Sequence, residues 1–370
     1  MEAGICRKHI AMFISSLDKG GSERVLVNLA EYFCGRGYLV TIVTQYKAQS
    51  EYGISDGIRR VYSEISPEEI GKDRVSNFWK RFRKLRGIWK REKPDLILSF
   101  IGKNNMMALL TSRGLHIPVV VSVRGEPKEE YYSRALRLAV RALFPLADGV
   151  ALQSRMSLDF FDKAVQKKAV ILPNSLHPAF MREIYKGERE KKIVAVGRVD
   201  ANKNHRMIIR AFASLARQYP EYELVIYGEG ELREGLIRQV EEMGLSDRIH
   251  LPGGTAEVAD AIWKASVFVL SSNSEGMPNT LMEAMALGIP CISTDCSGGG
   301  PAELIKSGEN GILTEMDNWK MLKDNLQKIM DDVEFARKLG ENGAKIKEKL
   351  NPDLINREWE RFFQRIMGEH

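Results

Sequence analysis

Two carboxylates, Glu275 and Glu283, stand eight residues apart in the stretch SEGMPNTLME (274–283). On a single helix they would be about 12 Å apart, which is wider than the roughly 5–9.5 Å between the two acids of a glycosidase. Pro278 instead marks a helix start, so Glu275 is expected in the preceding loop and Glu283 in the first turn. The spacing therefore disfavours hydrolysis by an acid and base pair.

The predicted helix start is also a predicted anion site. The unpaired amides of a first helical turn and the helix dipole favour a phosphate, here over residues 276–281. The two acids would then accept hydrogen bonds from hydroxyl groups on either side of that phosphate. One alternative stays open for Glu283, because Thr280-x-x-Glu283 fits a capping box that serves only the helix itself.

A second group of polar residues lies in GRVDANKN (197–204), which again follows a strand and precedes a helix. Arg198 and Lys203 are the cations expected to hold a diphosphate without a metal ion. The alternative is that both are solvated surface residues. The Gly-rich turn GEGEL (228–232) follows the next strand, and we expect it to line the same site.

The first predicted strand leads into DKGGSERV (18–25), where a Gly-Gly pair ending at Gly21 lets the backbone approach a ligand. Ser22 is expected to cap the following helix, and a plain tight turn is the alternative. The stretch is not G-x-G-x-x-G, which disfavours a dinucleotide dehydrogenase.

Arg124 ends the apolar run IPVVVSVR (117–124). A charged residue at the carboxyl end of a buried parallel strand is expected to point at the ligand-binding edge of the sheet. Arg124 would hold an acceptor or a phosphate there, and an ion pair with Glu126 or Glu129 is the alternative.

The segment 72–93 is the most basic part of the chain. Phe78, Phe82, Leu85 and Trp89 form one helical stripe. The stripe is surrounded by cations that include Lys80, Arg81, Arg83, Lys84 and Arg86. Either the helix packs on a sheet with its cations solvated, or the cations hold an acceptor, a polyphosphate or an anionic membrane surface. Nucleic acid is disfavoured, because no nucleic-acid-binding signature accompanies the charge.

Short apolar runs alternate with helical patterns along the chain, as in a parallel sheet buried on both faces. The predicted strands are 9–17, 38–45, 94–100, 117–123, 148–154 and 168–173, then 192–197, 222–228, 248–253, 266–272, 289–294 and 311–315. The polar segment 177–192 separates the two sets. The sequence predicts an α/β protein with two doubly wound Rossmann-like domains, 1–176 and 193–350, facing each other across a cleft. A helix over 351–370 would pack back across the domains.

Composition agrees with an ordinary globular protein of this size. The chain has 370 residues, 44% of them hydrophobic and 28% charged, and a net charge of +6 that favours anionic partners. An N-terminus without a signal-peptide pattern predicts a cytoplasmic protein. Cys6, Cys34, Cys291 and Cys296 form no C-x-x-C pair, so we expect reduced thiols and no metal site.

Taken together, these motifs resemble the retaining glycosyltransferases of family 4, which have the two-Rossmann-domain GT-B fold. The resemblance rests on the E-x7-E element within SEGMPNTLMEAMALGIPCI, on GRVDANKN, GEGEL and GGSERV, and on LPN (172–174). It spans almost the whole chain. It implies metal-independent transfer from a nucleotide-diphosphate sugar, with no cofactor.

The resemblance also implies roles for single residues. Arg198 and Lys203 would bind the donor diphosphate, Glu275 the hydroxyls of the transferred sugar, and Glu283 the ribose. The backbone would lie along the sugar and phosphates of the donor at seven residues: Gly21, Gly197, Gly276, Met277, Pro278, Asn279 and Thr280. Many members have a histidine where this chain has Arg124, so no side-chain base is assigned, and Arg124 is expected to contact the sugar or the acceptor.

GGSERV and the basic segment resemble the bacterial subset that acts on lipid-linked or cell-surface glycans, at the inner face of the cell membrane. A UDP-sugar is the first expectation for the donor, and GDP- and ADP-sugars stay open. Two other functions stay open as well. One is an epimerase of UDP-N-acetylglucosamine with the same fold, and the other is an inactive partner that binds a lipid-linked glycan through 72–93.

Overall fold

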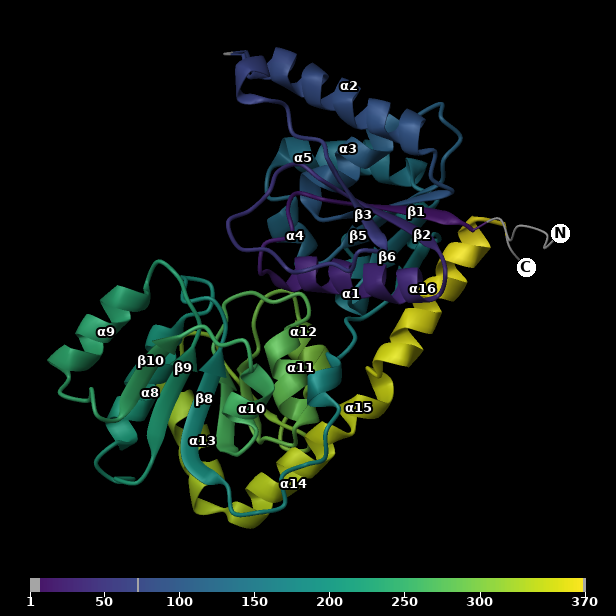
Figure 1. Cartoon of the computed structure of the whole chain (residues 1–370). Helices are drawn as coiled ribbons and strands as arrows, with labels where there is room; N and C mark the ends of the chain where they lie inside the picture. The colour runs from purple at the N-terminus through teal and green to yellow at the C-terminus, as the bar shows by residue number, and fades with distance from the viewer. Residues whose placement is uncertain (1–6, 72, 369–370) are drawn as a thin grey trace. The chain divides into compact units, whose positions relative to one another are not determined.

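A computed structural model of the protein describes residues 7–71 and 73–368. Cys6 lies outside the described residues. The chain divides into two compact units, which are described separately below. Unit 1 comprises Met1–Asn174 and Asp353–His370, and unit 2 comprises Ser175–Pro352. Figure 1 shows the elements of both units, most of them with their labels.

Unit 1 is built on a parallel sheet with the strand order β3-β2-β1-β4-β5-β6-β7. Its strands are β1 (His9–Ile14), β2 (Leu39–Thr44), β3 (Ile58–Tyr62), β4 (Leu96–Phe100), β5 (Val119–Val123), β6 (Gly149–Leu152) and β7 (Ala169–Ile171). The strand order reverses between β1 and β4, which are neighbours in the middle of the sheet. Six of these strands were predicted. The seventh, β3, was missed because IRRVY has no continuous apolar run and lies at the sheet edge.

Helices cover both faces of this sheet. They are α1 (Gly21–Gly35), α2 (Arg74–Glu92), α3 (Gly102–Ser112), α4 (Pro127–Glu130), α5 (Arg134–Leu143), α6 (Arg155–Leu158), α7 (Lys163–Gln166) and α16 (Pro352–Ile366), with short 3-10 turns at Pro67–Glu69 and Phe144–Leu146. One apolar core joins α1 and α16 to β1, β2 and β4, and a second joins α2, α3 and α5 to the other face. The parallel sheet buried on both faces is therefore confirmed.

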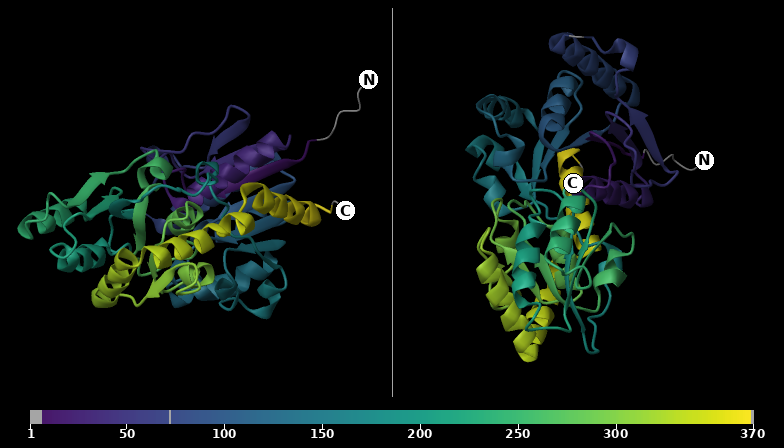
Figure 2. Two further views of the ribbon diagram at one scale, coloured as in Figure 1. Left: turned by 90° about the horizontal axis from the view of Figure 1, so that it is seen from below. Right: turned by 90° about the vertical axis from the view of Figure 1, so that its left-hand side faces the viewer.

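The C-terminal helix α16 completes the core of unit 1. Trp359 and Phe363 are buried, with the Phe363 ring stacked 5.1 Å from Phe33 and the Trp359 ring centroid 6.4 Å from Phe100. Figure 2 shows this helix (yellow) beside the purple N-terminal elements. The last segment of the chain thus closes the core that the first segments begin.

Unit 2 has a second parallel sheet, with the order β10-β9-β8-β11-β12-β13. Its strands are β8 (Glu190–Val196), β9 (Glu223–Tyr227), β10 (Ile249–Gly253), β11 (Ala265–Leu270), β12 (Cys291–Thr294) and β13 (Ile312–Thr314). Each was predicted. The helices are α8 (His205–Leu215), α9 (Arg233–Glu242), α10 (Val258–Ile262), α11 (Asn279–Ala286), α12 (Gly300–Leu304), α13 (Trp319–Asp331), α14 (Val333–Ala344) and α15 (Ile346–Lys349), with a 3-10 turn at Pro178–Phe180.

The predicted linker 177–192 runs along unit 2. Its last residues form the start of β8, and the Arg189 guanidinium donates hydrogen bonds to the carbonyl groups of Trp263, Ala265 and Gly288. Burial lowers the pKa of this arginine. These bonds hold the segment on the unit that follows it.

Candidate functional site

The loop after β11 carries Glu275, and the helix after that loop carries Glu283. The helix α11 begins at Asn279 with Pro278 as its N-cap, and Gly288 follows its end with a φ of +70°. The predicted helix start is confirmed, but Glu283 is the fifth residue of α11 and therefore lies beyond the first turn, in which it was expected. Thr280 lies inside the helix and is not its N-cap, so the capping-box interpretation is wrong. The Glu283 carboxylate is instead on a buried side chain, 2% exposed.

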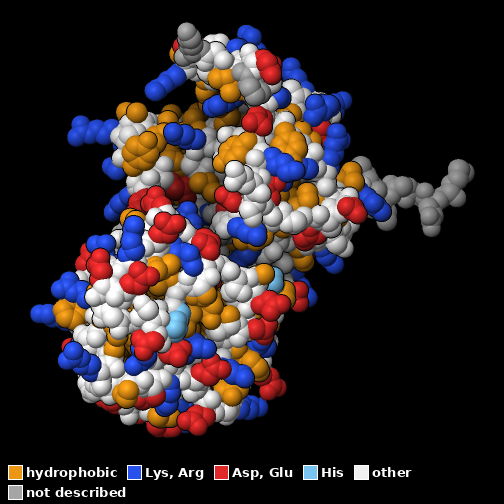
Figure 3. Space-filling model, turned by 60° about the vertical axis from the view of Figure 1, so that its left-hand side comes forward, with side chains coloured by type: hydrophobic (Ala, Val, Ile, Leu, Met, Phe, Trp, Pro, Cys, Tyr) orange, Lys and Arg blue, Asp and Glu red, His pale blue; other side chains and the backbone are white. Residues whose placement is uncertain are grey.

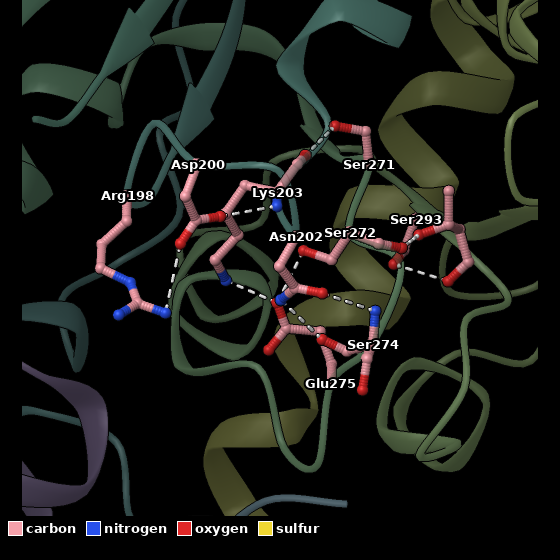
Figure 4. A network of polar contacts seen from close by, with 10 residues as sticks. Arg198, Asp200, Asn202, Lys203, Ser271, Ser272, Ser274, Glu275 and Ser293 are labelled. Atoms are coloured by element: carbon pink, nitrogen blue, oxygen red, sulfur yellow. Dashed lines mark hydrogen bonds and ion pairs between the residues drawn. The ribbon is translucent and has the colours of Figure 1, made fainter. Parts of the chain in front are cut away.

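An ion pair joins this loop to GRVDANKN. The Lys203 ammonium lies 2.5 Å from the Glu275 Oε1 atom, and the two side chains are only 16% and 13% exposed. Ser272 donates a second hydrogen bond to the same oxygen, at 2.6 Å. In the described part of the chain both bonds end on Oε1, so the Oε2 atom is positioned to accept a bond from a hydroxyl group. Figure 4 shows the pair between the two loops.

Uncharged side chains connect the same two loops. Asn202 donates a hydrogen bond to the carbonyl of Ser274 and accepts one from its amide, each 3.0 Å long. Ser271 donates to the carbonyl of Lys203 at 2.6 Å. Asn202 and these serines were not among the predicted site residues. Their position at the carboxyl ends of adjacent strands, β8 and β11, was the available signal.

Glycines set the shape of these loops through close backbone contacts. A Cβ at Gly228 would lie 1.8 Å from the carbonyl oxygen of Gly197, and a Cβ at Gly300 would lie 2.2 Å from that of Gly276. The GEGEL turn therefore supports the GRVDANKN loop by packing against it. Gly300 begins α12, which sequence reasoning did not single out, although SGGGP (297–301) follows a strand and opens a helix.

Arg198 lies in the same loop as Lys203 but is much more exposed to solvent. Its guanidinium is 3.2 Å from the Asp200 carboxylate, and its side chain is 75% exposed. The same carboxylate accepts a hydrogen bond from the backbone amide of Lys203 at 3.0 Å, so Asp200 connects the Arg198 side chain to the backbone of Lys203 (Figure 4). Arg198 and Lys203 thus extend from one loop, as predicted, but only Lys203 is held against Glu275.

His205 begins α8, directly after this loop. It is 4% exposed, and its Nδ1 atom has no hydrogen-bond partner among the described residues. Burial, and then the Lys203 charge, lower the pKa of His205 to about 4. The imidazole is therefore neutral at pH 7 and adds no charge beside Lys203.

This burial predicts a loss of stability in acid. In the unfolded chain His205 has an ordinary pKa of about 6.5, so below that pH it binds a proton there but stays neutral in the folded protein. We therefore expect the free energy of unfolding to fall by about 3 kcal/mol as the pH falls towards 4. His205→Met should remove this part of the loss. Urea unfolding of both proteins at about pH 7 and about pH 4.5 measures it. Equal acid losses in both would contradict the prediction.

Unit 1 carries the remaining predicted residues. Gly21 is the first residue of α1, whose N-cap is Gly20 with no side-chain cap bond. The expectation that Ser22 caps this helix is therefore wrong, because Ser22 lies inside it. The apolar face of α1 is buried and includes Val25, Leu26 and Leu29.

Arg124 is turned into the interior of unit 1. It is 6% exposed, donates hydrogen bonds to the Leu172 carbonyl and the Asn174 side chain, and lies 5.9 Å over the Trp359 ring. Burial lowers its pKa to about 9. Its backbone amide donates a hydrogen bond to the Glu130 carboxylate, and among the described residues its guanidinium forms no ion pair with Glu126 or Glu129. These contacts favour a packing role for Arg124.

The cations of α2 fall into two groups. Lys80 and Lys84 donate to the carbonyl groups of Glu69 and Glu64, and Arg86 donates to those of Thr111 and Arg113. Arg81 and Arg83 are exposed and make no hydrogen bond or ion pair with other described residues. Part of the predicted cluster is therefore structural, and part is available to a partner.

The chain matches two family models that together cover most of its length. Residues 178–346 match "Glycosyl transferases group 1", and residues 19–180 match "Glycosyltransferase Family 4". The chain belongs to the glycosyltransferases. The first match contains the Lys203 and Glu275 loops of unit 2, so this glycosyltransferase carries both within its family domain.

Individual proteins resemble the glycosyltransferase along most of its length. The "GalNAc-alpha-(1->4)-GalNAc-alpha-(1->3)-diNAcBac-PP-undecaprenol alpha-1,4-N-acetyl-D-galactosaminyltransferase" of Campylobacter jejuni is 28% identical, over 95% of this chain and 96% of the relative. A second galactosaminyltransferase of that organism, "N-acetylgalactosamine-N,N'-diacetylbacillosaminyl-diphospho-undecaprenol 4-alpha-N-acetylgalactosaminyltransferase", is 27% identical, over 92% of this chain and 94% of the relative.

Solved structures show the same fold. Anabaena HepE, crystallised with UDP, superposes with a TM-score of 0.82 at 16% identity, covering 97% of this chain and 100% of HepE. Sucrose-phosphate synthase of Thermosynechococcus elongatus has a TM-score of 0.83 at 19% identity, with 98% and 100% covered. The GT-B fold of two Rossmann-like domains is therefore confirmed.

Proposed function

We propose that this glycosyltransferase moves a hexose or an N-acetylhexosamine from a nucleotide-diphosphate sugar to a lipid-linked or cell-surface glycan, with retention of configuration. The observation that carries the proposal is the Lys203–Glu275 pair, in which the cation for a phosphate and the acceptor for a sugar hydroxyl are already in contact. The donor is a UDP-sugar, and the new bond is an α-linkage.

The charges of the site suit a donor diphosphate and the sugar beyond it. Lys203 and Arg198 neutralise the diphosphate, and backbone amides at the start of α11 add hydrogen bonds to it. The Oε2 atom of Glu275 accepts a bond from a hydroxyl of the transferred sugar. Glu283, in the same helix, accepts bonds from the ribose. Backbone segments also lie along the donor, at Gly197, Gly276, Met277, Asn279 and Thr280.

The reaction breaks the bond from the sugar C1 to the diphosphate oxygen and forms a bond from C1 to the acceptor oxygen on the same face. The acceptor hydroxyl gives its proton to an oxygen of the departing diphosphate, so no side-chain base is needed. Lys203 stabilises the negative charge that develops on the leaving group. The products are the elongated glycan and the nucleoside diphosphate.

The acceptor assignment is supported by the names of the relatives and by the charge of unit 1. Both Campylobacter relatives are named for acceptors on undecaprenyl diphosphate. Across residues 7–71 and 73–368, no helix is both long enough and apolar enough to cross a bilayer. We therefore propose peripheral attachment at the inner face of the membrane through the exposed cations of α2, Arg81 and Arg83.

A product analysis tests the proposed function. The protein is incubated with UDP-, GDP- and ADP-sugars and a glycan on a lipid diphosphate, and the product is examined by mass spectrometry and by the anomeric coupling in its NMR spectrum. An elongated glycan with an α-linkage is expected. A β-linkage would contradict retention, and turnover of donor without any acceptor would identify an epimerase.

We expect transfer to continue after removal of divalent cations. Lys203 and Arg198 supply the positive charge that a metal ion provides in other transferases, so EDTA should leave most of the initial rate. The measurement is the rate of release of nucleoside diphosphate with and without EDTA. Complete loss of the rate, with recovery on adding Mg²⁺ or Mn²⁺, would contradict the proposal that Lys203 and Arg198 neutralise the diphosphate without a metal ion.

A further inference from the structure

One carboxylate of unit 1 holds two loops together. Glu130, the last residue of α4, accepts hydrogen bonds at its Oε1 atom from the backbone amides of Gly125 and Arg124, at 2.7 and 3.1 Å. Its Oε2 atom accepts a third bond, 2.9 Å long, from the backbone amide of Gly102. Each oxygen therefore serves a different loop, because 124–125 follows β5 and 101–102 follows β4.

The surroundings of this carboxylate are unusual for an acid. Acidic side chains (red) are spread over the face of the molecule that Figure 3 shows. Glu130 as a whole is half-buried, but its carboxylate faces backbone amides. Burial raises the pKa of Glu130, while the three amides and the Arg124 charge act in the opposite direction. Burying a carboxylate costs free energy unless hydrogen bonds compensate it, so the three bonds and the burial depend on one another.

The loop after β4 contains a strained residue. Ile101 has a φ of +71°, a conformation that is unfavourable for a β-branched side chain, and Gly102 follows with a φ of +41°. Strain of this kind costs about 1–3 kcal/mol and is found at active sites and ligand-binding loops. The Ile101 amide donates a hydrogen bond to the Ser122 carbonyl, and the next amide donates to Glu130. The bond to Glu130 is therefore one of the contacts that maintain a conformation which Ile101 disfavours.

Both loops lie at the carboxyl edge of the sheet in unit 1. The strand β4 is the neighbour of β1 where the strand order reverses, and β5 is the next strand. In open α/β sheets this edge, near such a reversal, is where ligands bind. A carboxylate that served only the end of α4 would have no need of Gly102, which lies 28 residues earlier in the chain. The third bond thus fixes the shape of the edge itself.

We propose that Glu130 is a positioning residue for the acceptor: it holds 101–102 and 124–125 as one rigid edge against which the acceptor glycan binds, with its attacking hydroxyl held in place. The assignment rests on the proposed function, because it names the part of unit 1 that orients the acceptor in that reaction. Glu130 acts through the backbone of the two loops and does not touch the acceptor. Donor binding belongs to Lys203 and Glu275 of unit 2, so it should not depend on Glu130.

The test compares Glu130→Gln with Glu129→Gln. The new glutamine has one oxygen, and its NH₂ group can only donate, so it can accept bonds from one loop but not from both. Glu129 is the neighbouring acid on α4, and its exposed side chain makes no hydrogen bond or ion pair with another described residue. A milder variant is Gly125→Ala, whose added Cβ would lie 3.1 Å from the Glu130 Oε1 atom and would displace the carboxylate without removing it.

Two quantities are measured for each protein. They are kcat/KM for the acceptor, with the lipid-diphosphate glycan of the product analysis at saturating donor, and the Kd of UDP by isothermal titration calorimetry. Glu130→Gln should lower kcat/KM for the acceptor by about tenfold to a hundredfold, because a misplacement of about 1 Å has an effect of this size. Gly125→Ala should lower it by a smaller factor, and Glu129→Gln should not change it. The Kd of UDP should stay the same in all variants.

Three results would overturn the proposal. One is an unchanged kcat/KM for the acceptor in Glu130→Gln, and another is an equal loss in Glu129→Gln. The third is a loss of UDP affinity as large as the loss in kcat/KM, because a general structural role would affect both quantities. If Glu130→Gln fails to fold, Gly125→Ala decides, and an unchanged kcat/KM in that variant would overturn the proposal.

The proposed function can fail separately from this inference. Sugar transfer that Glu130→Gln leaves unaffected would contradict the positioning role alone. If the protein transfers no sugar from any donor, binding of the same glycan is measured by calorimetry in the presence of UDP. Weaker binding to Glu130→Gln than to the unmodified protein would then contradict the transferase alone, and equal binding would contradict both.

Discussion

Glu275→Gln should reduce kcat/KM for sugar transfer by about 1,000-fold or more, which corresponds to about 4 kcal/mol of lost transition-state stabilisation. The substitution keeps the shape of the side chain. It removes the negative charge that orients Lys203 and replaces a strong hydroxyl acceptor with a weaker one. Because Lys203 and Glu275 are both nearly buried, the loss of one leaves the other charge poorly compensated.

The two partners should also behave as a unit. Lys203→Met should reduce transition-state stabilisation by about as much as Glu275→Gln. The loss in the double variant should be far smaller than the sum of the two single losses. The matched control is Glu257→Gln, an exposed glutamate of unit 2, which should retain the full rate. Circular dichroism and thermal unfolding establish that each variant is folded. Full activity in a folded Glu275→Gln protein would contradict a role for Glu275 in sugar transfer.

Trp359→Ala should destabilise unit 1 by about 3–5 kcal/mol, the usual cost of removing a buried Trp side chain. The Trp359 ring is 1% exposed and packs against Phe100 and Phe363, and the Arg124 guanidinium lies over it. Its removal therefore leaves a cavity and also takes away the ring next to a buried cation. Urea unfolding followed by circular dichroism measures the change.

The control for this prediction lies on the same helix. Leu354 is 42% exposed, and Leu354→Ala should change the unfolding free energy by no more than about 0.5 kcal/mol. If Trp359→Ala and Leu354→Ala shift the unfolding curve equally, α16 does not contribute to the core in the way described.

Much of the fold could be predicted because buried parallel strands are nearly continuous in apolar residues. The strand β11, for example, reads ASVFVL and has only one residue that is not buried. The edge strand β3 lacks this signal, because IRRVY contains an exposed arginine, Arg59, and a second arginine, Arg60, that pairs with Glu51. The helical spacing of apolar residues also predicted only part of the packing of α2. Leu85 and Trp89 of the predicted stripe are buried, whereas Phe78 is exposed.

The candidate site was predictable where residue type and position at a strand end agreed, as for Lys203 and Glu275. Sequence reasoning had no means to choose between a solvated lysine and a buried ion pair. It could not identify Asn202 either, because its contribution is a reciprocal hydrogen bond with the Ser274 backbone. For Arg124, the place at a strand end was predictable, but the contacts of its guanidinium were not. They involve Leu172, Asn174 and the ring of Trp359, which lies more than two hundred residues later in the chain.

The position of α16 has a consequence for how the protein is made. Chains are synthesised from the N-terminus, and domains fold as units as they emerge from the ribosome. Ile355, Trp359 and Phe363 belong to the core of unit 1 but are translated after all of unit 2. Unit 2 is continuous in sequence and can finish folding first. Unit 1 must instead wait with one apolar face uncovered, although most of its chain is translated earlier.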